Sequence, residues 1–347
     1  MAVGAVIVTL FAAHESRDES SRHTIDWPGI AAISTGLTAL VLALIEGNGW
    51  GWGSDRVVAL LVTAAVGLIG FVIVERRVRE PMVDFALFRS RTFLGSNMIA
   101  FIVTFSMLAM FFFTALYMQN ILGYSAIEAG IRFLPSTLMI VLVAPLAGRL
   151  ADRIGPRLPM VVGLSLTSLA LFIQTRIDVG TGYGLLLPAF VLMGLGMALV
   201  MSPMSTAAMN SVPPQKAGVA SGIVSMSRMV GGTFGVAALG ALFQHLARNE
   251  LAHSLAGSGI GAAQQERLVN SLGTASDGAH LPPVAAHAAQ DAFIHALANG
   301  MWLAGSVAAL GAVLAFVLIG GKPAKRPDPA RQPEAAAATA EAVPAAR

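Results

Sequence analysis

Eight long runs of apolar residues, separated by polar segments, dominate the chain. Each run is about 17 to 28 residues long, and about 20 apolar residues let an α-helix cross the hydrocarbon core of a bilayer. No segment shows the period of two that a half-buried strand requires. The pattern therefore predicts an all-α polytopic membrane protein, with spans at residues 30–46, 57–74, 97–118, 130–150, 158–175, 185–208, 218–245 and 293–319.

The chain starts with a ninth apolar segment, MAVGAVIVTLFAA, which is too short for a full span. No Lys or Arg precedes it, although a signal peptide usually has a positively charged leader. We interpret residues 1–13 as the end of a transmembrane helix whose beginning is missing.

Basic residues between the spans collect on one side. Of the 22 Lys and Arg, Arg132 and Arg228 lie within spans and four lie in segments on one side, namely Arg56, Arg176, Arg248 and Arg267, which leaves sixteen for the other side. Cytoplasmic loops of membrane proteins accumulate Lys and Arg. The asymmetry predicts an inner (plasma) membrane protein with a cytoplasmic C-terminus. It also makes 246–292 an external loop and 320–347, which is rich in Ala, Pro and charge, a disordered cytoplasmic tail.

Composition narrows the function classes. Hydrophobic residues make up 55% of the chain and charged residues 12%, about half the charged fraction of typical soluble domains. The formal charge of +3 belongs to residues that flank spans and forms no soluble basic face, so nucleic-acid binding is not expected. Cysteine is absent, which excludes disulfides and thiolate metal sites. Without a P-loop, a serine elbow, paired carboxylates or ligand-spaced histidines, we expect neither an enzyme nor a metal or other cofactor.

The sharpest local motif is GRLADRIGPR at residues 148–157, in a short loop between two spans. Gly148 permits close helix approach, and Gly155 ends the helix and turns the chain. The Asp152 carboxylate can meet the N-terminal end of a neighbouring helix. Three arginines can bridge to carbonyls, carboxylates or lipid phosphates: Arg149, Arg153 and Arg157. The alternative is an ordinary basic loop.

This motif resembles the loop G-x-L-a-D-r-x-G-r-r/k of the major facilitator superfamily. Further segments are similar to its fourteen-helix branch of drug:proton antiporter-like exporters: TIDWPG at 24–29, GWGWGS at 49–54, YMQNILGYSAIEAGIRFLP at 117–135 and AGVASGIVSMSRMVGGTFG at 217–235. The resemblance implies that 1–13 ends the sixth helix, that 14–96 holds a cytoplasmic loop and a central helix pair, and that 97–319 forms the C-terminal six-helix bundle. Five preceding helices of that family are absent from the sequence.

Charges inside spans are costly and usually functional. Arg228 lies about ten residues into its span and would cost roughly 2.5–3.5 kcal/mol if it faced lipid. It is expected to contact carbonyls and hydroxyls of its own bundle or, alternatively, to face a transport pathway. Arg132 follows Glu128 by four residues, which favours an ion pair on one helix; a role at the outer mouth is the alternative. No Asp, Glu or His lies at mid-span, so no proton carrier is evident.

Two helical stripes invite a binding or a packing interpretation. Met193, Met197, Met201 and Met204 share one face of a predicted helix, with Phe105 as a candidate opposite wall. Thioethers suit a surface that accepts varied apolar ligands, although plain packing is the commoner role. Two small-xxx-small pairs predict close helix contact: Gly218 with Gly222, and Gly231 with Gly235.

The resemblance implies export of small, amphipathic or drug-like molecules in exchange for protons, by alternating access of two bundles. The loop residues Gly148, Arg149, Asp152, Arg153, Gly155 and Arg157 would form a conformational switch. Arg228, Arg132, Phe105, Met193, Met197 and Met201 would line the cavity. The partners would be substrate, protons, the lipid bilayer and the missing N-terminal bundle. The alternative is a non-transporting membrane remnant or an assembly partner of a transporter.

Overall fold

A computed structural model describes residues 26–78, 85–254 and 283–321, and all the regular elements in them are helical. The elements are α2 (Trp27–Trp50), α3 (Asp55–Arg77), η1 (Phe85–Arg89), α4 (Arg91–Asn120), α5 (Ala126–Arg132), α6 (Leu134–Ile154), α7 (Arg157–Gln174), α8 (Tyr183–Asn210), η2 (Pro214–Lys216), α9 (Ala217–Ser254) and α11 (Pro283–Leu318). Eight helical segments among them are long and apolar enough to cross a membrane, which confirms the eight predicted spans. The predicted N-terminal partial helix and the tail lie outside the described residues.

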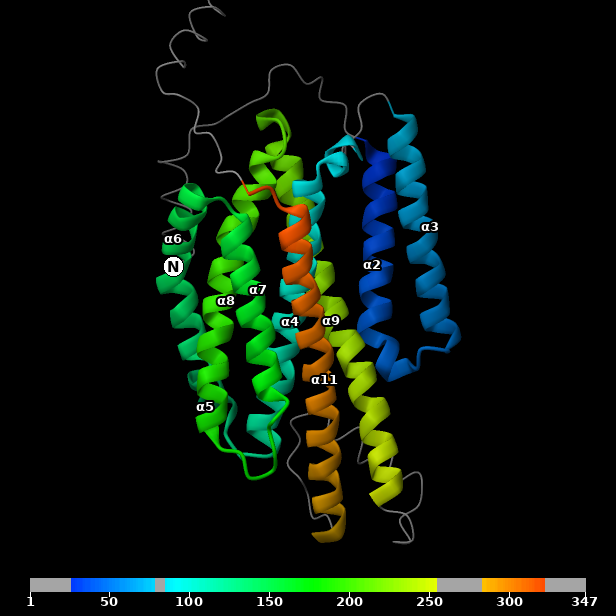
Figure 1. Cartoon of the computed structure of the whole chain (residues 1–347). Helices are drawn as coiled ribbons and strands as arrows, with labels where there is room; N and C mark the ends of the chain where they lie inside the picture. The colour runs from blue at the N-terminus through cyan, green and yellow to red at the C-terminus, as the bar shows by residue number, and fades with distance from the viewer. Residues whose placement is uncertain (1–25, 79–84, 255–282, 322–347) are drawn as a thin grey trace, which may run out of the picture.

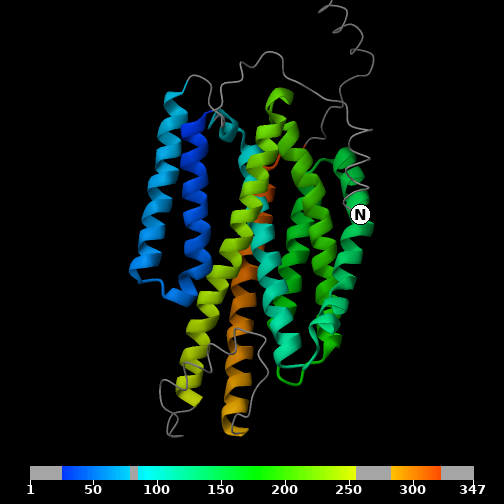
Figure 2. The same ribbon diagram turned by 180° about the vertical axis from the view of Figure 1, so that it is seen from behind.

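The helices run roughly parallel to one axis, so that the chain crosses the same thickness repeatedly (Figure 1). In one bundle, α4 packs on α9 and α11, α8 packs on α6 and α7, and α7 packs on α11. The pair α2 and α3 stands beside this bundle and contacts it through α9, as the reverse view also shows (Figure 2). On Gly67 a Cβ atom would lie 2.7 Å from Gly36 Cα, so α2 and α3 cross with their backbones in contact.

The two ends of the bundle differ in composition. Residues Arg76, Arg77, Arg149 and Arg153 occupy the ends of α3 and α6, which we call the arginine end. The three tyrosines of the chain lie at the opposite end, which we call the tyrosine end: Tyr117 near the end of α4, Tyr124 in the connection between α4 and α5, and Tyr183 at the start of α8. The alternation of the helices therefore brings the basic segments together as the charge pattern predicts.

Local sequence signals explain where several helices begin and end. The Asp26 side chain accepts a hydrogen bond from the Gly29 amide at 2.9 Å, with Pro28 in the first turn, so Asp26 caps the start of α2. At the end of α6, Gly155 has φ +90°, a conformation that costs glycine little. This residue therefore ends the helix and turns the chain into α7.

The fourth span, predicted at 130–150, runs from Ala126 to Ile154 in the structure and contains a break in the helix. Helix begins at Ala126, breaks at Phe133 and resumes as α6. The physical reason is Pro135, which has no amide hydrogen to donate back to the Ile131 carbonyl. The early start follows from a capping box, in which Ser125 and Glu128 satisfy each other's backbone amides.

The predicted external loop, 246–292, is helical at both of its edges. Helix α9 continues to Ser254 and α11 begins at Pro283, giving helices of 38 and 36 residues. At 1.5 Å per residue each is about 55 Å long, well beyond a hydrocarbon core of about 30 Å. The extensions carry buried apolar residues, among them Leu251 on α9 and Ala289 on α11, and Glu250 of α9 lies 3.9 Å from His295 of α11. Apolar side chains thus continue the α9–α11 contact past the predicted span ends.

Candidate functional site

The switch motif at the arginine end divides into packing residues and exposed residues. A Cβ atom on Gly148 would lie 3.0 Å from the Ser202 hydroxyl, so α6 packs closely on α8 at this glycine. The side chains of Arg149, Asp152 and Arg153 are exposed at the end of α6. They are placed where a second element could meet them, and their predicted role as a conformational switch stays a prediction.

Arg157, the last motif residue, does not join the exposed group. It begins α7 and is half-buried, with its guanidinium carbon 3.8 Å from the centre of the Phe316 ring on α11. A cation over an aromatic face is attracted by the ring quadrupole. In this structure Arg157 therefore ties α7 to the end of α11, a contact that the motif did not predict.

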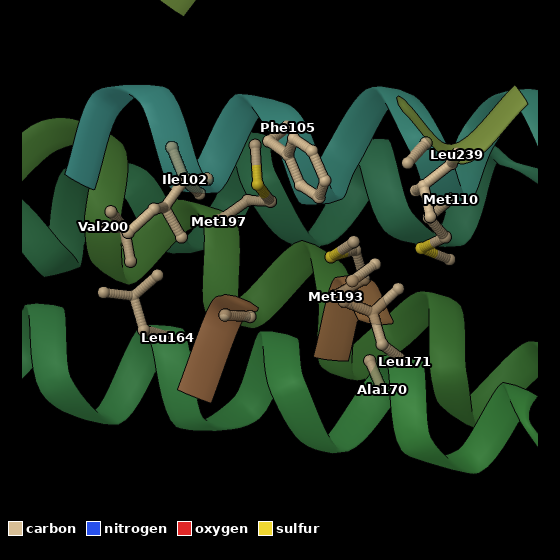
Figure 3. Close-up of a cluster of buried hydrophobic side chains, with 14 of the residues drawn as sticks. Ile102, Phe105, Met110, Leu164, Ala170, Leu171, Met193, Met197, Val200 and Leu239 are labelled. Atoms are coloured by element: carbon tan, nitrogen blue, oxygen red, sulfur yellow. The ribbon is translucent and has the colours of Figure 1, made fainter. Parts of the chain in front are cut away.

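The methionine stripe lies in the interior of the bundle. Met193, Met197 and Met204 are fully buried, and Met201 is half-buried. Figure 3 shows Met193 and Met197 among apolar side chains of neighbouring helices, including Ile102, Leu164 and Leu171. In the described part of the chain the stripe thus packs, as the alternative interpretation had it.

Phe105 is also buried, with 4% of its surface exposed. Its ring stacks on Phe101 at 6.3 Å and lies 6.3 Å from Phe234, so it joins α4 to α9. An open apolar groove of about 510 Å³ does exist, between α2 and α3, but none of the residues predicted to line a cavity borders it.

The two predicted glycine pairs behave differently. A Cβ atom on Gly231 would lie 2.4 Å from the Phe101 carbonyl oxygen, and one on Gly235 would lie 2.6 Å from that of Phe105. These two glycines bring α9 into backbone contact with α4. Gly218 and Gly222 are exposed, and among the described residues no atom lies within 4 Å of a Cβ position on either, so the predicted contact is not made there.

Further glycine contacts were missed. A Cβ atom on Gly163 would meet the Gly196 carbonyl oxygen at 2.6 Å, and one on Gly194 would meet that of Ser136 at 2.3 Å. Gly163 lies on α7 and Ser136 on α6, so both of these helices touch the backbone of α8. Gly194 and Ala198 have the small-xxx-small spacing, but spacing alone does not show which glycine faces a neighbouring helix.

Arg228 is half-buried on α9 and has no hydrogen bond or ion pair with the described residues. The residue before it, Ser227, does form a hydrogen bond: its hydroxyl donates to Asn97 Oδ1 at 3.0 Å. The Asn97 amide group in turn donates to the Phe93 carbonyl at 2.9 Å. The carbonyl and hydroxyl partners expected for Arg228 are therefore not seen, while a polar α4–α9 contact that was not predicted lies beside it.

Arg132 sits at the tyrosine end in an aromatic setting. Its guanidinium carbon lies 3.7 Å from the centre of the Tyr124 ring and 5.8 Å from that of Tyr183. One guanidinium nitrogen donates to the Glu128 backbone carbonyl at 3.1 Å. The Glu128 carboxylate instead accepts from the Ser125 amide at 2.8 Å, so the predicted Glu128–Arg132 ion pair is replaced by a capping box.

Polar contacts between helices at the tyrosine end were also missed. The Thr114 hydroxyl donates to Gln174 Oε1 at 2.7 Å, joining α4 to α7. The Tyr117 hydroxyl lies 2.7 Å from the Thr181 carbonyl, in the connection between α7 and α8. Polar side chains in apolar spans were a usable signal, since such groups pair when buried.

These features define a class: a multi-pass α-helical membrane protein, whose bundle is held by glycine contacts and carries a basic loop at one end. The Major Facilitator Superfamily matches residues 1–236 of the 347, and the chain belongs to that family. It is a family of transporters, not enzymes, which confirms the family predicted from the motifs.

Curated relatives are named as resistance and export proteins. The chain is 37% identical over 242 residues to multidrug resistance protein Stp of Mycobacterium tuberculosis, covering 69% of this chain and 45% of that protein. It is 34% identical over 240 residues to the tetracenomycin C resistance and export protein of Streptomyces glaucescens, with the same coverages of 69% and 45%. The chain thus spans about half the length of the curated relatives it matches.

The fold resembles a solved transporter. A bacterial homolog of the human lysosomal transporter Spinster, in an inward-facing and occupied conformation, superposes with a TM-score of 0.51 over 87% of this chain and 69% of that one. The sequence identity of 18% means that this likeness supports the fold alone.

Proposed function

We propose that the protein works in the export of small, amphipathic or drug-like molecules, as part of a proton-coupled antiporter of the plasma membrane. The observation that carries the proposal is the 34% to 37% identity to proteins named for antibiotic export and multidrug resistance. A third relative, at 36% identity over 219 residues, is named for puromycin resistance. These names cover chemically different compounds, which is why we propose a broad substrate class.

We base the proposed orientation on the charge distribution and the proposed mechanism on the transporter family. In the proposed orientation the arginine end is cytoplasmic, because Lys and Arg accumulate on that side of membranes. Alternating access would rock this bundle against a second one, around a site between them. Asp152, Arg149 and Arg153, exposed at the cytoplasmic end, would form and release contacts with the second bundle.

Arg228 is the residue of this chain that we place in the transport pathway. A guanidinium is costly inside a membrane unless it meets polar groups or water. Because Arg228 has no polar partner among the described residues, a cavity shared with a second bundle would meet this requirement. A substrate with a hydrogen-bond acceptor would suit such a site.

The proton carrier is proposed to lie outside this chain. Proton coupling requires a group that binds and releases a proton along the pathway. No Asp, Glu or His side chain of the described spans is buried at mid-span. A bundle equivalent to the rest of the relatives' length would supply the carrier and the opposite wall of the cavity. A non-transporting assembly role is the second candidate, favoured by the lack of a buried mid-span Asp, Glu or His in the described spans.

An accumulation assay separates these functions. Three strains of a bacterium that lacks its own exporters would carry an empty vector, this chain alone, or this chain together with the N-terminal half of the tetracenomycin C exporter. We expect reduced accumulation of ethidium and puromycin only in the third strain, abolished by a protonophore. Accumulation equal to the vector in the third strain would favour the assembly role, whereas efflux by the chain alone would contradict the need for a second bundle.

A further inference from the structure

The break between α5 and α6 leaves a backbone carbonyl without its helical donor. In a continuous helix the Ser136 amide would bond to the Arg132 carbonyl. Here the Ser136 amide instead donates to the Phe133 carbonyl at 3.1 Å, and the Thr137 amide donates to the same oxygen at 3.3 Å. Pro135 has no amide hydrogen at all. The Arg132 carbonyl therefore depends on a partner from elsewhere in the bundle.

Tyr183 supplies that partner. Its hydroxyl donates to the Arg132 carbonyl at 2.9 Å, across 51 residues of sequence. Tyr183 is the first residue of α8, so this bond joins the start of α8 to the break in the neighbouring span. The Tyr183 ring also lies 6.2 Å from the ring of Phe190, which is about two turns further along α8. The hydroxyl is thus held at a defined position.

Helix α5 has few other attachments to the bundle. Of its seven residues only Ala129 is buried. Its capping box joins the N-cap residue Ser125 to Glu128 of the same helix, so these bonds stay within α5 and its cap. The remaining contacts are at its end, where Arg132 stacks on Tyr124 and where the Phe133 ring lies 4.9 Å from Phe111 and from Phe190. Segments with few buried contacts reorient at low free-energy cost. Phe133 packs firmly while α5 in front of it does not, which makes the break a hinge.

We infer that Tyr183 is a positioning residue of the transport cycle, whose hydroxyl bond to the Arg132 carbonyl sets the angle of α5 against α6. The inference rests on the proposed function, in which the tyrosine end is the outer end and α5 borders the outer mouth. Release of this one bond frees α5 to swing about Phe133, while the aromatic contacts of Phe133 keep α6 in place. The bond therefore favours one of two α5 positions.

Spin-label distances test the hinge directly. The chain has no cysteine, so Ile127→Cys on α5 and Leu142→Cys on α6 give a single labelled pair at two exposed positions. We expect the otherwise unmodified full chain, in lipid nanodiscs, to show one dominant distance. Tyr183→Phe keeps the ring and removes the donor. We expect it to raise the population of a second distance, relative to the dominant one, roughly two- to tenfold, which is the effect of losing one hydrogen bond.

Two further variants make the test specific. Tyr124→Phe keeps the ring under Arg132 and removes a hydroxyl that bonds to none of the described residues, so distances like those of the unmodified chain are expected. Pro135→Ala restores an amide donor to the break and is expected to narrow the distribution. Unchanged distances in Tyr183→Phe, or an equal change in Tyr124→Phe, would overturn the inference, and Pro135→Ala tests the hinge even if Tyr183→Phe does not fold.

The transport role needs a second readout. In the strain that combines this chain with the second bundle, Tyr183→Phe is expected to lower the maximal efflux rate several-fold and to leave the half-saturating substrate concentration unchanged. A shifted distance with a normal efflux rate would overturn the role in transport. Shifted distances with no efflux by any variant, including the unmodified chain, would show instead that the proposed function has failed.

Discussion

Gly231→Leu is expected to separate α9 from α4 and to lower the free energy of unfolding by roughly 3 kcal/mol, the upper part of the range for overpacked cores. The cause is steric, because even a Cβ atom at this position would lie 2.4 Å from the Phe101 carbonyl oxygen and 2.7 Å from Phe101 Cα. Both atoms belong to the backbone and cannot rotate away. The measurement is unfolding of the purified chain in mixed micelles, followed by circular dichroism.

Gly222→Leu is the matched control for this prediction. It lies on the same helix but is exposed, and no atom of the described part of the chain lies within 4 Å of its Cβ position. Its effect should stay within about 0.5 kcal/mol, as for most surface substitutions. Both variants gain the same helix propensity, so their difference isolates the contact with α4. Equal stability of the two variants would show that α9 does not touch α4 at Gly231.

Arg228→Ala is expected to lower efflux at least about tenfold, which corresponds to losing roughly 1.4 kcal/mol of stabilisation in the transport step. The same substitution removes a charge that costs roughly 2.5–3.5 kcal/mol when it faces lipid, so stability should be unchanged or higher. If Arg228 lies in the pathway, its substitution should therefore lower transport without lowering stability. Efflux is measured in the strain that carries this chain with the second bundle.

Two variants control for charge alone. Arg176→Ala removes an exposed arginine from the connection between α7 and α8 and should leave efflux unchanged. Arg228→Lys keeps the charge but loses the planar fork of donors, so partial activity is expected. Full efflux by Arg228→Ala would remove Arg228 from the pathway. A large loss of stability in that variant would instead assign the residue to packing.

The membrane-spanning architecture was predictable because membrane insertion depends mainly on local composition. A window of about 20 residues decides whether a segment is more stable in lipid than in water, whatever its neighbours are. All eight spans were therefore recovered. Errors fell where another interaction intervened, as with Pro135, which breaks its span, and Leu251, which is buried in the part of α9 beyond the predicted end.

The site residues were less predictable because their roles depend on which helix lies opposite. Spacing gave the same signal for Gly222 and Gly231, yet only Gly231 meets another backbone. It likewise could not separate a binding face from a packed face for Met193 and Met197, both of which are buried. A stripe defines a side of a helix, and only the rotation of that helix within the bundle decides what the side touches.

The sequence by itself determined that this chain is a multi-pass helical membrane protein of a transporter family, with its basic segments gathered at one end. The spans and the charge asymmetry follow from transfer free energies and charge counts that each segment carries on its own, whereas the family was indicated by the resemblance of the motif at residues 148–157. Only the tertiary structure decided that Arg157 stacks on Phe316, that Arg228 lacks a polar partner among the described residues, and that Tyr183 holds the broken span. Such contacts join positions dozens of residues apart, and helix packing alone sets the distances between them.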